Sequence, residues 1–343
     1  MAGADSTTTR VLRIEGLPII AVMLALVAAF MVAAPEVFLG YRIYMSFLAT
    51  VPPLLVLAVA LTMVIAAGEI DLSFPSVIAL SGWALAYCTH EWGSPWLGLI
   101  FALLGGALVG YLNGVLIARV GIPSIIATLA TQFLWGGLTT VFSQGLSYSL
   151  GDVEQFFLWQ LLVGRIGAFP VQSLWALAVA GTLWLVLNRR RFGEHLLFIG
   201  DNVKVAEVVG VNVAREKIRM FVLMGVMAAF ASVLLTFENK NFFNTQGGGY
   251  LLEVMAAVFI GGTSVFGGKA SVVGTVAGSF IIGMVEAGLV ATGLQGFWVR
   301  AVVGMVFLAA VIGHLVIEEP ERGRTLFGAI RGKFPFSAKT RSR

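Results

Sequence analysis

The chain has 343 residues, of which 58% are hydrophobic and 12% are charged. A soluble domain carries about 25% charged residues, so this composition excludes a soluble globular protein and predicts an all-α polytopic membrane protein. The formal net charge of +4 is attributed to basic loops at a membrane rather than to a nucleic-acid partner. The single cysteine, Cys88, excludes an intrachain disulfide.

Apolar runs of transmembrane length recur along the chain. A helix that crosses the bilayer needs about 20 apolar residues. The first run is long for a signal peptide, and the Pro35-Glu36 that follows does not resemble a cleavage site, so this run is predicted to be a span. About ten transmembrane helices are predicted, at 17–34, 46–67, 74–90, 95–117, 122–142, 171–188, 218–237, 250–266, 271–291 and 298–317. The runs 74–90 and 250–266 are short enough to be broken or re-entrant.

The distribution of basic residues sets the predicted orientation. Residues 189–219 hold 11 of the 40 charged residues, and seven of the 11 are Lys or Arg. Cytoplasmic loops carry an excess of Lys and Arg, so this loop is expected inside the cell, with six spans before it and four after. The predicted parts are a cytoplasmic N-tail (1–16), a transmembrane domain (17–317) containing the cytoplasmic loop 189–217, and a basic cytoplasmic C-tail (318–343).

The first polar motif places two carboxylates, Glu69 and Asp71, between two apolar runs. A charge that faces lipid costs at least about 2.5–3.5 kcal/mol, so neither carboxylate is expected to do so. One interpretation is an ion or proton site. The other is a cytoplasmic turn in which Gly68 permits the reversal and Asp71 or Ser73 caps the next helix. The turn is favoured because no intramembrane His, Lys or Arg is evident as a relay partner.

The second motif is the glycine-rich run Gly261–Lys269 (GGTSVFGGK). It does not match a phosphate-binding loop, in which the lysine is followed by Ser or Thr, because Ala270 follows here. A tight cytoplasmic reversal between two spans is predicted instead, with glycines that allow positive φ and close helix approach. Those glycines are Gly261, Gly262, Gly267 and Gly268.

The third motif lies within the long loop. Asn202 suits the N-cap and Gly210 the C′ position of a short helix at Val203–Val209. A helix of this length is not stable alone, and five apolar residues make it too apolar to stand free in water. It is expected to dock, either on its own bundle or in a groove of a partner.

Isolated polar residues in the predicted spans have two interpretations. They are candidate pathway residues, or they hydrogen-bond between helices, which is the favoured reading. They are Asn113, Gln132, Glu253 and Glu286. The longest external segment, 143–170, contains the run FFLW at 156–159, which is predicted either to lie in the membrane interface or to pack on its own bundle. The sequence shows no nucleophile–base pair, metal cluster or nucleotide-binding motif, so no enzymatic activity, metal or cofactor is predicted.

Four segments together resemble the permease subunits of bacterial ABC importers for monosaccharides, the ribose/xylose/arabinose-type family. The resemblance extends from about residue 45 to residue 315. Its motifs are GEIDLS at 68–73, YLNGVLIARVGIPSIIATLAT at 111–131, IGDNVKVAEVVGVNV at 199–213 and GYLLEVMAAVFIGGTSVFGG at 249–268. The chain departs from the family pattern at Glu69, Glu207 and Ala270, and in the segment 237–249.

The resemblance implies a fold and a set of partners. The fold is that of the vitamin B12-type importer permeases in a bacterial inner membrane. The permease forms a dimer, of identical chains or with a paralogue, around a central pathway. A separate cytoplasmic ATPase, which binds ATP and magnesium, drives it, and an extracytoplasmic binding protein delivers the solute. The implied ATPase-coupling helix is Asp201–Gly210, with coupling residues Gly200, Asp201, Asn202, Ala206, Glu207 and Gly210.

The implied solute is a monosaccharide or a related small polar molecule, namely a pentose, hexose or polyol. Two alternatives remain open. One is a nucleoside or furanosyl signal-molecule permease of the same family. The other is an ion-coupled secondary transporter that uses Glu69, Asp71 or Glu286. Membrane lipid is the remaining expected partner, and no nucleic acid is expected.

Overall fold

The computed structural model describes residues 16–318. The tails predicted at 1–16 and 318–343 lie outside these residues except for Gly16 and Glu318. The described part of the chain is mostly helical, which confirms the predicted all-α polytopic class. Its strands are four two-residue pieces that form two antiparallel pairs, β1 (Tyr148–Ser149) with β4 (Asn241–Phe242) and β2 (Arg165–Ile166) with β3 (Phe169–Pro170).

Each of the ten predicted spans contains one helix. These helices are α2 (Leu17–Ala33), α4 (Tyr41–Ala66), α5 (Phe74–Trp92), α6 (Pro95–Val115), α7 (Ser124–Ser143), α9 (Gln172–Arg189), α12 (Val213–Asn239), α13 (Tyr250–Ile260), α14 (Val272–Ala291) and α15 (Trp298–Glu318). A π-helical turn, η1 (Leu116–Val120), extends α6. Within the described residues, five helices are long and apolar enough to cross a membrane, namely α4, α6 with η1, α7, α12 and α14.

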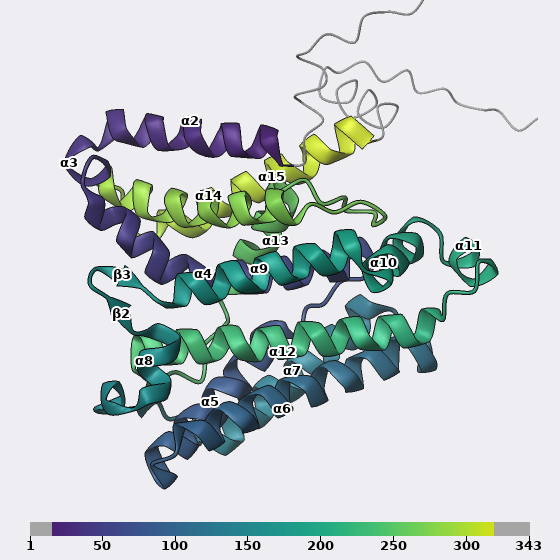
Figure 1. Ribbon diagram of the computed structural model, residues 1–343, viewed down its shortest axis with the longest axis horizontal. Helices are drawn as coiled ribbons and strands as arrows, with labels where there is room; N and C mark the ends of the chain where they lie inside the picture. The colour runs from purple at the N-terminus through teal and green to yellow at the C-terminus, as the bar shows by residue number, and fades with distance from the viewer. Residues whose placement is uncertain (1–15, 319–343) are drawn as a thin grey trace, which may run out of the picture.

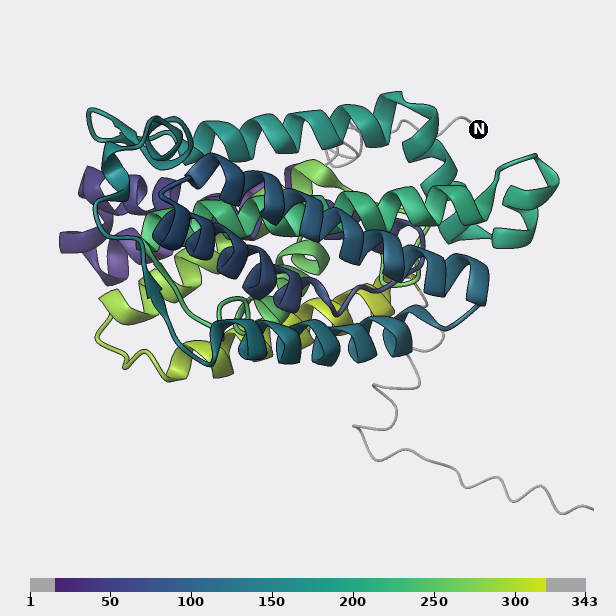
Figure 2. The ribbon, with the colours of Figure 1, turned by 90° about the horizontal axis from the view of Figure 1, so that it is seen from below.

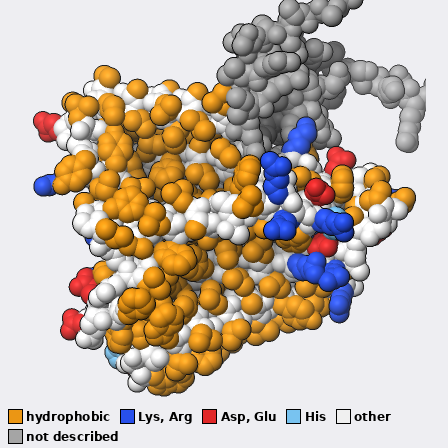
Figure 3. Space-filling view, viewed as in Figure 1, with side chains coloured by type: hydrophobic (Ala, Val, Ile, Leu, Met, Phe, Trp, Pro, Cys, Tyr) orange, Lys and Arg blue, Asp and Glu red, His pale blue; other side chains and the backbone are white. Residues whose placement is uncertain are grey.

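The long helices lie side by side along one axis (Figure 1). Short elements mark the two ends of the bundle. At one end are α10 (Arg191–Asp201) and α11 (Val203–Val208), and at the other are the β2–β3 hairpin and α8 (Phe157–Val163). We call these the α11 end and the hairpin end. In the face shown in Figure 3, hydrophobic side chains cover the middle of the bundle and most Lys and Arg side chains gather at the α11 end.

Helix α4 forms the centre of the core, because its residues from Val51 to Ala66 are all buried. It packs against α9, α12, α13 and α14. Close helix contacts depend on small residues, as the glycine content predicts. At Gly110 of α6, for example, a Cβ atom would lie 2.2 Å from the carbonyl oxygen of Phe221 in α12.

The predicted span 250–266 is broken, as its length indicated. After α12 ends, β4 pairs with β1, and residues 243–249 then turn back into the bundle. Gln246 donates hydrogen bonds to Ser232 and Thr236 of α12 at 3.1 and 2.8 Å. Eleven residues of α13 cover about 16 Å, which is about half of a bilayer core. Helix α13 is therefore a half-length helix, and Figure 1 shows it in the middle of the bundle.

The other short span, 74–90, is a continuous helix of 19 residues. It begins inside the bundle, because the linking residues 67–73 run inward from the α11 end. The backbone N–H of Leu72 donates to the Thr128 hydroxyl at 3.0 Å, one turn into α7. Irregular backbone occurs at membrane depth only where protein buries it or where it lines a water-filled cavity.

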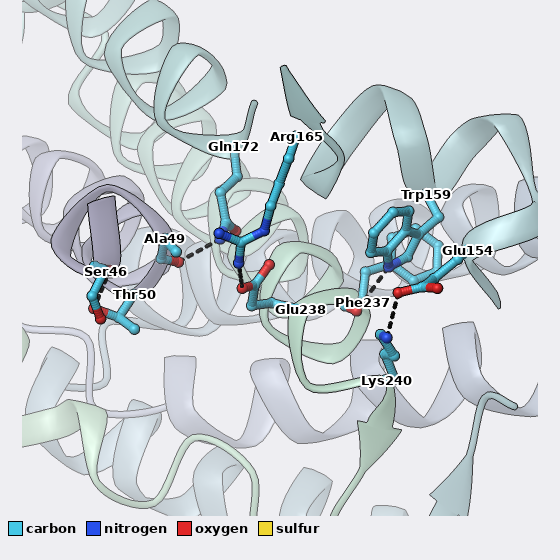
Figure 4. Close-up of polar contacts among 10 residues, drawn as sticks. All are labelled: Ser46, Ala49, Thr50, Glu154, Trp159, Arg165, Gln172, Phe237, Glu238 and Lys240. Atoms are coloured by element: carbon cyan, nitrogen blue, oxygen red, sulfur yellow. Dashed lines mark hydrogen bonds and ion pairs between the residues drawn. The ribbon is translucent and has the colours of Figure 1, made fainter. Parts of the chain in front are cut away.

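The segment 143–170 packs on its own bundle, which decides between the two alternatives for its aromatic run. Leu158 and Leu162 of α8 are buried. The indole N–H of Trp159 donates to the carbonyl oxygen of Phe237 at 3.0 Å, and Arg165 pairs with Glu238 at 3.1 Å. Figure 4 shows these contacts together with the Lys240–Glu154 ion pair and the hydrogen bond from Gln172 to the Ala49 carbonyl.

Candidate functional site

Helix α11 has the local geometry that the sequence predicts. The Asn202 side-chain oxygen accepts hydrogen bonds from the backbone N–H groups of Lys204 and Val205, at 3.0 and 3.2 Å. Gly210 follows the helix with φ of +88°, a conformation that favours glycine. The chain therefore enters and leaves α11 through two defined caps.

The apolar side chains of α11 are exposed rather than packed on the bundle. Val205 is 55% exposed and Val208 is 88% exposed, and only Ala206 is buried. Two views show α11 projecting beyond the ends of the neighbouring helices (Figures 1 and 2). Figure 3 shows hydrophobic side chains on this projecting tip. Exposed, clustered apolar side chains on a capped helix are typical of a protein-interaction surface.

Four glycines bring the three sequence motifs together just beside α11, at what we call the glycine junction. A Cβ atom on Gly200 would lie 1.9 Å from the Ala66 carbonyl oxygen, and one on Gly267 would lie 2.9 Å from the Cα of Gly68. Gly268 donates its backbone N–H to the Ala66 carbonyl at 2.9 Å. At these glycines, the end of α4, the end of α10 and the α13–α14 turn therefore meet through close contacts between backbone atoms.

An ion pair links the same region to α12. Lys217 donates a hydrogen bond to the Glu69 carboxylate, and both side chains are largely buried. Lys217 lies in the second turn of α12, four residues after Val213. The sequence does not indicate that Glu69 and Lys217 pair, because the two residues are 148 positions apart.

The carboxylate of Asp71 is buried within a hydrogen-bonded network. It accepts hydrogen bonds from the backbone N–H of Ser73 at 2.7 Å and from the Ser73 hydroxyl at 2.6 Å. The Ser73 hydroxyl accepts from the Asn113 side chain at 2.8 Å. Of the two residues predicted to cap α5, Ser73 stands at the N-cap position, but its hydroxyl donates to Asp71 and caps no backbone N–H group. The Asp71 side chain instead accepts backbone N–H at the start of the helix. Asn113 takes the favoured role of a hydrogen bond between helices.

The glycine-rich run forms the predicted reversal. Gly262, Gly267 and Gly268 have positive φ angles of +90°, +85° and +74°. Gly261 lies against the start of α14, where a Cβ atom would approach the backbone nitrogen of Thr275 to 2.5 Å. Both roles predicted for these glycines are therefore present.

The remaining polar candidates divide between two adjoining cavities. Gln132 lines a cavity of about 220 Å³, which we call the niche, together with residues of α5, α7 and the segment 243–249. Glu253 and Arg300 line a second cavity of about 300 Å³, which shares Gly248 with the niche. Glu286 is placed next to Glu253, to which it hydrogen-bonds. The sequence does not predict that Glu253 and Glu286 meet, because they belong to different helices.

No group of three or more His, Cys, Asp or Glu residues is placed to hold a metal ion within residues 16–318.

Comparison with known proteins assigns the chain to a protein family. The family described as "Branched-chain amino acid transport system / permease component" matches residues 43–311. The chain belongs to this permease family. The ribose import permease of Bacillus subtilis is 35% identical over 257 residues, 75% of this chain and 79% of that protein. The fructose import permease of Rhizobium meliloti is 31% identical over 302 residues, 86% of this chain and 83% of that protein.

A third relative is named for the import of a different molecule. The autoinducer 2 import system permease of Photorhabdus luminescens is 30% identical over 266 residues, 76% of this chain and 79% of that protein. The predicted resemblance to import permeases is confirmed, and so is the prediction of a transport permease subunit rather than an enzyme. The chain is a multi-pass membrane protein.

Proposed function

We propose that this chain is the membrane subunit of an ATP-driven importer for a monosaccharide. In this proposal, α11 inserts into a separate cytoplasmic ATPase subunit, which binds the ATP and magnesium. The α11 end faces the cytoplasm, so both tails lie inside. The hairpin end faces outward and receives the solute from a binding protein. A second permease chain, identical or a paralogue, completes the pathway.

The observation that carries the proposal is the exposure of the α11 valines. A six-residue helix that exposes Val205 and Val208, with Val209 exposed directly after it, is unfavourable in water unless another surface covers these side chains. Asn202 and Gly210 fix the helix ends, so the exposed face is presented in one orientation. Lys204 and Glu207 flank it with one charge of each sign. These features support docking on a partner rather than on the chain's own bundle.

The glycine junction supports a route for transmission from the ATPase to the membrane helices. Gly200 and Asp201 end α10 directly before the α11 cap, and Gly200 touches α4 and the α13–α14 turn. Contacts between backbone atoms leave no flexible side chain to absorb a displacement. A movement of α11 would therefore be passed to the linker 67–73 and to the reversal 261–268, and so to α5, α13 and α14.

The solute class follows from the relatives and from the cavity beside Gln132. The relatives are named for the import of ribose, fructose and autoinducer 2, of which the first two are monosaccharides. The family description names branched-chain amino acids. The described side chains that line the niche carry no charge, which favours a neutral polyhydroxylated solute over a zwitterion. Gln132 is the pathway candidate that this cavity supports, and Glu253 lies in the cavity next to it.

Reconstitution tests the proposal. We expect vesicles with the permease, its ATPase and its binding protein to take up labelled D-ribose or D-fructose only when ATP is present. We expect no uptake by vesicles that contain the permease alone, with or without a proton or sodium gradient. Gradient-driven uptake by the permease alone would instead identify a secondary transporter and refute the proposal.

A further inference from the structure

The niche lies about half-way along the bundle. Gln132 is eight residues beyond the start of α7, which corresponds to about 12 Å along the helix. Its neighbours Ser76 and Ala79 belong to the first turns of α5, which itself begins inside the bundle. The third wall is the segment 243–249. The irregular segment 243–249 and the first turns of α5 therefore meet about half-way along the bundle.

Several polar groups in this niche have no hydrogen-bond partner within residues 16–318. The side chains of Gln132, Asn244 and Thr245 make no hydrogen bond there. Gln246 is only 8% exposed, and its side-chain oxygen is unpaired. Its amide nitrogen must donate to Ser232, because the Ser232 hydroxyl already donates its own hydrogen to the Ile78 carbonyl. The amide orientation is thus fixed, and the unpaired oxygen of Gln246 is buried rather than open to the niche.

These groups cannot face lipid. Hydrocarbon offers no hydrogen-bond partner, so unpaired amides at mid-depth are unfavourable unless water, protein or solute contacts them. The ring of Phe133, which is exposed, lines the same niche. An apolar surface beside a few convergent polar groups is the usual composition of a site for a small organic molecule.

We propose that the niche contacts the transported solute, with the amide of Gln132 hydrogen-bonding sugar hydroxyl groups and Phe133 packing on the apolar face of the sugar. This inference rests on the proposed function, since it assigns a contact site to the imported solute. Amides suit a sugar because each hydroxyl group both donates and accepts. A pathway site must also release its ligand, and neutral hydrogen bonds bind less strongly than ion pairs.

The first test measures transport by the assembled complex in vesicles, with labelled D-ribose, D-fructose and L-leucine as probes. Leucine is included because Glu253 and Arg300 lie in the adjoining cavity. For the sugar that is taken up, we expect Gln132→Leu to lower uptake per ATP hydrolysed by about 10-fold. Stimulation of the ATPase by the loaded binding protein should stay unchanged, as should the KM for sugar. Gln132→Asn should retain most of the uptake, and Leu134→Ala is the control on the same helix.

The second test measures the labelling of an introduced cysteine instead of transport. It therefore still applies if Gln132→Leu fails to assemble. Cys88 is the only native cysteine, so Cys88→Ala gives a thiol-free background. In that background, we expect a water-soluble thiol reagent to label Gln132→Cys and the transported sugar to slow the labelling. Leu134→Cys, which is 53% exposed on α7 outside the niche, should not be labelled.

The outcomes separate the inference from the proposed function. Normal uptake per ATP in Gln132→Leu, or labelling of Gln132→Cys that the sugar does not slow, overturns the inference and leaves the importer intact. An unaltered complex that takes up neither sugar, or takes up only leucine, overturns both.

Discussion

Gly200 lies directly against the last carbonyl group of α4, so that a Cβ atom on Gly200 would stand 1.9 Å from the carbonyl oxygen of Ala66. Gly200 is also the next-to-last residue of α10, two positions before the Asn202 cap of α11. The buried helix α4 therefore meets α10 directly before the exposed helix α11 begins.

Gly200→Ala should disrupt the glycine junction. The methyl group would meet backbone atoms of Ala66 and Gly268, which cannot rotate away. We expect a loss of about 3 kcal/mol or more in stability, at the upper end of overpacking effects, with failure to assemble as the extreme. Thermal unfolding in detergent measures it. Gly105→Ala on α6 is the control, because no atom lies within 4 Å of its added Cβ.

The Glu69–Lys217 pair should show strong coupling between its two members. Removing one member leaves a largely buried charge unpaired, which costs about 3–5 kcal/mol in fully buried pairs. We expect Glu69→Gln and Lys217→Met each to lower the unfolding temperature, and the double variant to recover most of the loss. A double-mutant cycle measures the coupling. Additive effects of the two substitutions would show that the pair does not contribute to stability.

Asn202→Ala should weaken binding to the ATPase without unfolding the permease. The Asn202 side chain caps α11 through two backbone N–H groups, and loss of such a cap costs about 1 kcal/mol. That cost would appear as weaker association, by up to about 5-fold, in a titration of the reconstituted permease with its ATPase. Asn202→Asp, which keeps an acceptor at the cap, is the matched control. Equal affinity of Asn202→Ala and the parent chain would argue against a docking role for α11.

Gln246→Met should destabilise the fold, whereas Gln132→Leu should not. Gln246 donates to Ser232 and Thr236 in the core of α12, and an unsatisfied buried polar group costs about 1–3 kcal/mol. Gln132 makes no hydrogen bond within the described residues. Thermal unfolding of the two variants side by side measures the difference. Equal stability of both variants would mean that Gln246 does not hold the segment 243–249 against α12.

Much of the fold could be predicted from the sequence because local rules determine it. Each apolar run overlaps one of the observed helices. Of the two short runs, 250–266 contains a half-length helix as its length indicated, whereas 74–90 is continuous. The Asn202 and Gly210 caps follow from side-chain and backbone preferences that need no tertiary context. The glycine-rich reversal at 261–268 is predictable for the same reason.

Contacts between distant segments could not be predicted. The glycine junction joins three motifs that are each recognisable alone, but nothing local shows that Gly68, Gly200 and Gly268 meet. Ser73 has the sequence signature of a helix cap, yet its hydroxyl bonds to Asp71 because a buried carboxylate has a stronger need for donors. Nothing in the local sequence predicts that Gln246 is buried, because it is a single glutamine in a polar loop. Its burial depends on the packing of the segment 243–249 against α12.

The most direct test of the central claim is the effect of Val205→Glu/Val208→Glu on stimulation of the partner ATPase. Two added charges on the exposed valine face cannot be buried in an apolar groove without a large desolvation cost. We predict normal membrane insertion and thermal stability of the variant permease, together with loss of ATPase stimulation and of sugar uptake. Lys204→Glu/Glu207→Lys, which reverses both flanking charges and keeps the valines, should retain more activity. Normal ATPase stimulation and uptake in the Val205→Glu/Val208→Glu variant would contradict the assignment of α11 as the coupling helix.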